Sequence, residues 1–160
     1  MTGNLKFRID HLRTRTHDAL TKVPWGGHGR IEADTVITDF QMPNGIIGTA
    51  DGKTLYVSDI NARQTYSYTI KDDGTLADKK PVMAAGSDGM TIDSDGNLYT
   101  TSSNARTGLQ IWSKEGKLLD SIPIGCANCC FGGKDGNILF ICAVREIYGV
   151  KMKTHRVGPG

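Results

Sequence analysis

The sequence predicts an all-β protein, because three of its stretches repeat one pattern of turns and short strands. The first residue of the pattern steps from Asn44 to Asp88 to Asn128, at intervals of 44 and 40 residues. The Asp-Gly pairs that follow, which begin at positions 51, 95 and 135, step by the same intervals. A period of roughly 40 to 45 residues built from short strands is typical of propeller blades, each of four antiparallel strands. The predicted fold is a β-propeller of about three blades.

Each predicted blade is a series of β-branched or aromatic runs separated by Gly, Asp and Asn, which suit tight hairpin turns. The blades are expected near 43–84, 87–123 and 127–157. In the first, the runs lie at 46–47, 55–57 and 65–70, with a last one ending at 83. In the second they lie at 90–92, 97–101, 109–113 and 118–122. The third offers 129–131, 138–142 and 146–152, and leaves open whether it has an outermost strand.

The second strand of each predicted blade carries an aromatic residue at one register, namely Tyr56, Tyr99 and Phe140. Successive side chains of a strand point to opposite faces, so these three are expected on equivalent faces between blades, and buried there. The preceding leucines are expected on the opposite face.

The first part of the chain does not repeat the blade pattern. Apolar residues recur there at intervals of three and four, which predicts a short helix over about 10–22. We therefore expect an N-terminal segment over 1–28 and a partial propeller over 29–160.

Composition is consistent with a turn-rich β protein, since the chain contains 20 glycines in 160 residues. A net charge of +2 argues against nucleic acid or an acidic membrane surface as a partner. There is no apolar run of the ~20 residues that a membrane span needs, and the first residues are too polar for a signal peptide. The expected location is the cytoplasm.

Asn44, Asp88 and Asn128 are the candidate site residues, because they occupy one structural position in consecutive blades. Their side-chain oxygens are expected to converge on the mouth of the central channel. Such oxygens are hard ligands that suit Ca²⁺, Mg²⁺, Mn²⁺ or a catalytic Zn²⁺. The alternative is that Asx residues before glycine only shape turns where strands begin.

The four cysteines at positions 126, 129, 130 and 142 are expected to be small buried thiols. Cys126 and Cys129 have the spacing of metal ligands, but no second Cys or His pair at zinc-site spacing accompanies them.

Several motifs, in the right order and spacing, resemble the gluconolactonase/regucalcin family of sugar-lactone lactonases. They are Met42-Pro43-Asn44-Gly45-Ile46, the segments at 51–59 and 93–99, Ser87-Asp88-Gly89-Met90, and Asn128-Cys129-Cys130-Phe131-Gly132-Gly133. The resemblance runs from about residue 29 onward and corresponds to the C-terminal half of the family's six-bladed ring.

The resemblance implies one catalytic divalent metal ion in the channel, with Ca²⁺ favoured and Zn²⁺, Mg²⁺ or Mn²⁺ as alternatives. Carried over residue by residue, it implies Asn44 and Asp88 as metal ligands and Asp88 as the catalytic acceptor of a proton from the attacking water. A third family ligand, a Glu from an earlier blade, has no matching residue here. Asn128 matches a position near the channel that is not a usual ligand.

The implied activity is hydrolysis of a lactone, a cyclic sugar ester, by metal-activated water. The alternative is a non-catalytic propeller that acts as a binding or assembly module. About three blades do not close a ring, which predicts a homo-oligomer, most simply a dimer of two half-rings.

Overall fold

The computed structural model describes residues 36–157. The chain divides into two units after Asp39, and the structural description below concerns the second, Phe40–Gly160. The helix expected over 10–22 lies outside the described residues. The described part consists of strands, turns and irregular segments, so it holds no helix that could span a bilayer.

Eleven strands form three antiparallel sheets, which confirms the all-β prediction for the described part of the chain. The first sheet has the order β1-β2-β3-β4 and the second the order β5-β6-β7-β8. The first contains β1 (Pro43–Gly48), β2 (Thr54–Asp59), β3 (Gln64–Ile70) and β4 (Leu76–Met83). The second contains β5 (Met90–Ile92), β6 (Leu98–Thr100), β7 (Leu109–Trp112) and β8 (Leu118–Ile122).

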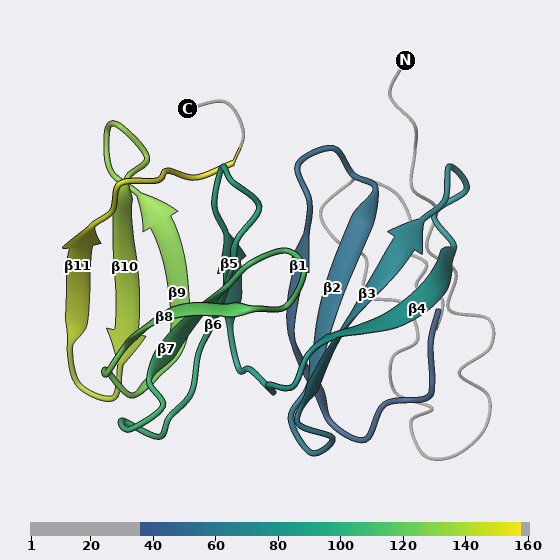
Figure 1. Ribbon diagram of the computed structural model, residues 1–160, viewed down its shortest axis with the longest axis horizontal. Coiled ribbons are helices and arrows are strands. Elements are labelled where there is room, and N and C mark those ends of the chain that lie inside the picture. The colour runs from purple at the N-terminus through teal and green to yellow at the C-terminus, as the bar shows by residue number, and fades with distance from the viewer. Residues whose placement is uncertain (1–35, 158–160) are drawn as a thin grey trace, which may run out of the picture. The chain divides into compact units, whose positions relative to one another are not determined.

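The third sheet has three strands in the order β9-β10-β11, so within the described residues it lacks a fourth. They are β9 (Cys126–Gly132), β10 (Ile138–Ala143) and β11 (Ile147–Lys151). The sheets follow one another in chain order, with β5 between β1 and β9 (Figure 1). Because β1, β5 and β9 are the first strands of their sheets, this is the arrangement of propeller blades around an axis.

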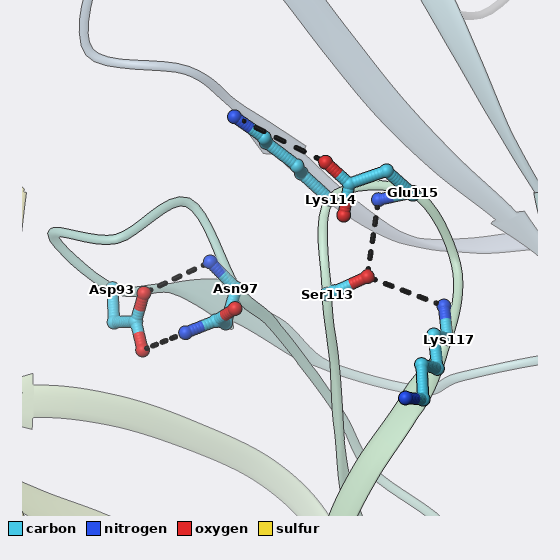
Figure 2. Close-up of polar contacts among 6 residues, drawn as sticks. All are labelled: Asp93, Asn97, Ser113, Lys114, Glu115 and Lys117. Carbon is cyan, nitrogen blue, oxygen red and sulfur yellow. Dashed lines mark hydrogen bonds and ion pairs between the residues drawn. The ribbon is translucent and has the colours of Figure 1, made fainter.

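The hairpin turns are closed by side chains that accept hydrogen bonds from the backbone. Asp93 Oδ1 accepts from the backbone N–H of Asn97 at 2.8 Å, while Oδ2 accepts from the Asn97 side-chain amide at 3.0 Å (Figure 2). In the turn between β7 and β8, Ser113 Oγ accepts from the N–H groups of Glu115 and Lys117 (Figure 2). Each Asp-Gly turn also has its glycine at positive φ, between 65° and 83°, a conformation that glycine adopts at little cost.

The sheets pack face to face through the alternation predicted from the second strands. Tyr56 joins Leu98 in the core between the first two blades, and Tyr99 joins Leu139 in the core between the last two. Each aromatic residue therefore faces the following blade, and each of these leucines faces the preceding one. Full burial of such a side chain contributes roughly 1.5–3 kcal/mol.

The expectation that all three aromatic residues are buried is wrong for Phe140. Tyr56 and Tyr99 are 8% and 1% exposed, whereas Phe140 is 39% exposed. Phe140 pairs with Cys130 on the face of β10 opposite Leu139. Among the described residues there is no further blade to cover that face, so the same register that buries Tyr99 leaves Phe140 in water.

Candidate functional site

The first strands of neighbouring blades bring Asn44 and Asp88 together. The N–H of Gly45 donates to Ser87 O at 2.9 Å, which holds β1 against the segment that leads into β5. The Asn44 side-chain amide then donates to Asp88 Oδ1 at 3.2 Å. Asn44 is exposed and Asp88 is half-buried, so both side chains stay accessible to a ligand.

The glycine that follows each of these two residues permits a close approach between blades. A Cβ at Gly45 would lie 2.9 Å from Ser87 O, and one at Gly89 would lie 2.9 Å from Ala127 O. Neither glycine has positive φ, so neither is there to allow a left-handed turn. The Asx-Gly pairs therefore mark the contact between successive first strands.

Asn128 lies at the corresponding position of the third blade, and its side chain is against Gly89, where an added Cβ would collide with it. Its Oδ1 accepts from the backbone N–H of Cys129 at 2.9 Å. Within residues 36–157, no hydrogen bond joins Asn128 to Asn44 or Asp88. The structure thus pairs two of the three candidate residues and places the third beside Gly89.

Buried hydroxyl groups hold the backbone around Asp88. Ser58 Oγ accepts from the N–H of Ser87 at 2.6 Å. Thr101 Oγ1 accepts from the N–H of Gly89 at 2.8 Å and contacts Ala127 O at 3.1 Å. Ser58, Ser87 and Thr101 are at most 2% exposed, so this network is shielded from water and keeps Asp88 in one place.

These hydroxyl residues were not predicted from the sequence, although the repeat pattern contains a signal for two of them. Ser58 and Thr101 each stand three positions after the leucine of their repeat, Leu55 and Leu98. Ser58 reaches Ser87, in the segment that leads into β5, and Thr101 reaches Ala127 in β9. Cys142 has the same place after Leu139, and it is exposed.

The Asp59 carboxylate holds the segment that leads into β1 by hydrogen bonds. Its Oδ2 accepts from the N–H of Gln41 at 2.7 Å, and its Oδ1 accepts from those of Met42 and Ala62, both at 3.1 Å. Burial alone raises the pKa of the Asp59 carboxyl, but these N–H donors outweigh it and hold the pKa below its ordinary value. The charged carboxylate thus fixes the backbone two residues before Asn44.

A cavity of about 220 Å³ lies beside Asp88. Its walls come from the turn after β2, which includes Ile60 and Arg63, and from the residues after β6, which include Ser102 and Ser103. Asp88 therefore borders both Asn44 and a recess large enough for a small molecule.

The cysteines are only partly as expected. Cys126 and Cys129 are buried, whereas Cys130 and Cys142 are exposed. Burial raises the pKa of the Cys129 thiol to about 12, and it also raises that of Cys126. Both buried thiols are therefore protonated at neutral pH, which makes them poor nucleophiles and poor metal ligands. Among the described residues, no three His, Cys, Asp or Glu side chains gather as a metal site would need.

The fold and site define a propeller segment with an amide and a carboxylate paired between two neighbouring blades. Residues 7–145 match the model of a family described as SMP-30/Gluconolactonase/LRE-like region. The chain belongs to this family.

Two curated relatives show how much of a family member the chain represents. It is 30% identical to a gluconolactonase of Zymomonas mobilis over 140 residues, covering 76% of this chain and 38% of the relative. It is 30% identical to regucalcin of Danio rerio over 110 residues, covering 62% and 37% respectively. The chain therefore spans well under half the length of these two relatives.

Solved structures show the same partial coverage. A gluconolactonase from Xanthomonas campestris is 27% identical, with a TM-score of 0.63, and the match covers 72% of this chain and 39% of that one. A calcium-binding protein, regucalcin, from Agrobacterium tumefaciens is 16% identical with a TM-score of 0.66, covering 76% and 49%. The second likeness shows the fold alone. The chain is thus about half of a six-bladed propeller.

Proposed function

We propose that Asn44 and Asp88 supply part of a divalent-metal centre that hydrolyses a sugar lactone. The observation that carries this proposal is the hydrogen bond between the two side chains, 44 residues apart in the sequence. Membership of a family that includes gluconolactonases supports the reaction class.

The pair fits a hard divalent cation in the chemistry of its donors. One carboxylate and one neutral amide oxygen are ligands that Ca²⁺ and Mg²⁺ prefer. A half-turn of the Asn44 amide exchanges its nitrogen for its oxygen at the place where it meets Asp88, so both residues can present oxygen to one ion. Two protein ligands fill only part of the coordination shell of such an ion, and the remaining ligands come from water and from outside residues 36–157.

A bound divalent ion supplies Lewis acidity to the lactone carbonyl. Asp88 would provide the negative charge that holds such an ion, and its remaining oxygen would accept a proton from the attacking water. Asn44 contributes an oxygen without charge, so it orients the site while leaving it electrophilic. The buried hydroxyls of Ser58 and Thr101 limit the movement of the Asp88 backbone.

We further propose that two copies of the chain complete the ring. Phe140 and Ile147, which are 39% and 75% exposed, belong to the face of the third sheet where a following blade would pack. A second copy with two-fold symmetry covers both open ends at once and doubles the number of Asn44 and Asp88 side chains at the channel. Light scattering at micromolar concentration should give the mass of two chains, and a well-folded monomer would contradict this assembly.

The function is tested by glucono-1,5-lactone hydrolysis, measured with a pH indicator above the uncatalysed rate. The assay is run with Ca²⁺, Zn²⁺, Mg²⁺ or Mn²⁺ and with excess EDTA. We expect activity with at least one ion, loss of it in EDTA and in Asp88→Asn, and no loss in the control Asp72→Asn, which changes an exposed turn carboxylate. A folded protein that hydrolyses no lactone with any ion would favour the non-catalytic binding or assembly module instead.

A further inference from the structure

Arg63 occupies a left-handed backbone conformation, which glycine more often adopts. Arg63 has φ of 50° and immediately precedes β3. Gly108, with φ of 58°, immediately precedes β7, the equivalent strand of the second blade. A residue with a Cβ is strained in this left-handed region, and such strain persists mainly where function or packing requires the residue.

Packing explains the glycine but not the arginine. A Cβ at Gly108 would collide with Ile122 O and lie 2.8 Å from the N of Ile124, so no side chain fits there. At Arg63 the side chain has space, because it lines the cavity of about 220 Å³ beside Asp88. The turn is held in this shape by a hydrogen bond from the N–H of Arg63 to Ile60 O at 3.1 Å.

The charges around this cavity favour an anionic group on the ligand at the Arg63 side. Of the described residues that line the cavity, Arg63 is the only cation and Asp88 the only anion. Within residues 36–157 the guanidinium forms no ion pair, so its donors are available. Guanidinium binds a carboxylate through two parallel hydrogen bonds, and the hydroxyls of Ser102 and Ser103 can pair with those of a sugar.

We propose that Arg63 is a specificity-determining residue that binds the carboxylate of a sugar acid in this cavity. This inference rests on the proposed function and names the ligand class for that site. When water adds to a lactone carbonyl and the ring C–O bond breaks, the product is a hydroxy acid that loses its proton at neutral pH. The carboxylate can belong to that product or to a lactone that carries a second acid group.

The first test measures binding without turnover. Calorimetry with gluconate is carried out in excess EDTA, so that failure of the metal centre does not affect the result. Gluconate should bind the wild type and bind Arg63→Gln at least tenfold more weakly, with Arg63→Lys between them and Arg106→Gln as the matched control. The neutral polyol glucitol should bind weakly to every variant. Equal gluconate affinity in wild type and Arg63→Gln, or no binding to either, would overturn the proposal.

A second variant separates ligand binding from stability. Arg63→Gly removes the strain at positive φ, so it should melt at the same temperature as the wild type or higher and still lose gluconate. Retention of gluconate binding in Arg63→Gly would overturn the proposal. Where the wild type is active, the KM values of Arg63→Gly separate the two ligands. If its KM rises for glucaro-1,4-lactone but not for glucono-1,5-lactone, the ligand is the acid-bearing lactone. If both KM values are unchanged and gluconate inhibits Arg63→Gly less than the wild type, the ligand is the product.

Discussion

The side-chain amide of Asn44 donates a hydrogen bond to Asp88 Oδ1 across the boundary between two blades. This contact exists because the backbones of β1 and of the segment before β5 approach closely, with Gly45 N and Ser87 O 2.9 Å apart. A larger residue at position 45 would separate the two blades and, with them, the two polar side chains.

Removal of the Asp88 carboxylate should abolish tight binding of a divalent ion. Asp88→Ala deletes the anionic partner of the pair, whereas Asn44→Ala deletes a neutral oxygen and should only weaken binding. Calorimetry with Ca²⁺, Mn²⁺ and Zn²⁺ measures both effects, and Asp72→Asn is the control. Unchanged affinity in Asp88→Ala would contradict the assignment.

A methyl group at position 89 should destabilise the protein, while one at position 48 should not. The Cβ of Gly89→Ala would lie 2.9 Å from Ala127 O and collide with Asn128, so we expect a cost of about 1–3 kcal/mol. At Gly48 the nearest atom of the described residues lies 3.9 Å from an added Cβ, and Gly48→Ala is the matched control. Chemical denaturation compares the two, and equal midpoints would show that the blades do not approach as described.

Tyr99 and Phe140 hold the same position in the second strand of their blades, but only Tyr99 is covered by a following blade. Tyr99→Ala and Phe140→Ala therefore test the effect of that cover. Tyr99 is buried and its ring meets Phe131 edge to face at 5.2 Å, so its truncation should cost roughly 3–5 kcal/mol. Phe140 is 39% exposed, and in the isolated chain its truncation should cost less than about 1 kcal/mol. Thermal melts measure both, and a Tyr99→Ala protein that melts within a degree or two of the wild type would disprove this packing.

Asp59 should make the fold sensitive to acid. Because its pKa is lower in the folded protein than in the unfolded chain, it stabilises the fold above the unfolded value, near pH 4, and this stabilisation is lost as the pH falls through the folded pKa. Asp59→Asn should therefore be less stable than the wild type at pH 7, with a difference that shrinks toward pH 3. Denaturation at both values measures this, and a constant difference would exclude the ionised carboxylate as the cause.

The repeat pattern was sufficient to predict the class of fold and the faces of the second strands. Tyr56 and Tyr99 are on the predicted faces because strand alternation is a local property of the backbone. The exposure of Phe140 was not predictable from that register, since it depends on which element lies against β10. The same holds for the site. Matched positions in the repeats indicated Asn44 and Asp88, whereas the supporting role of the Ser58 and Thr101 hydroxyls is visible only in contacts between blades.

What the sequence determined by itself is the periodicity: where strands turn, which side chains alternate, and which Asx residues share a place in each repeat. These features depend on backbone dihedrals and on short-range spacing, which neighbouring residues determine. Tertiary structure alone decided that Asn44 forms a hydrogen bond with Asp88, and that Arg63 lines the cavity beside Asp88. The physical reason is that such contacts join residues tens of positions apart, so they depend on how closely two backbones approach rather than on either segment alone.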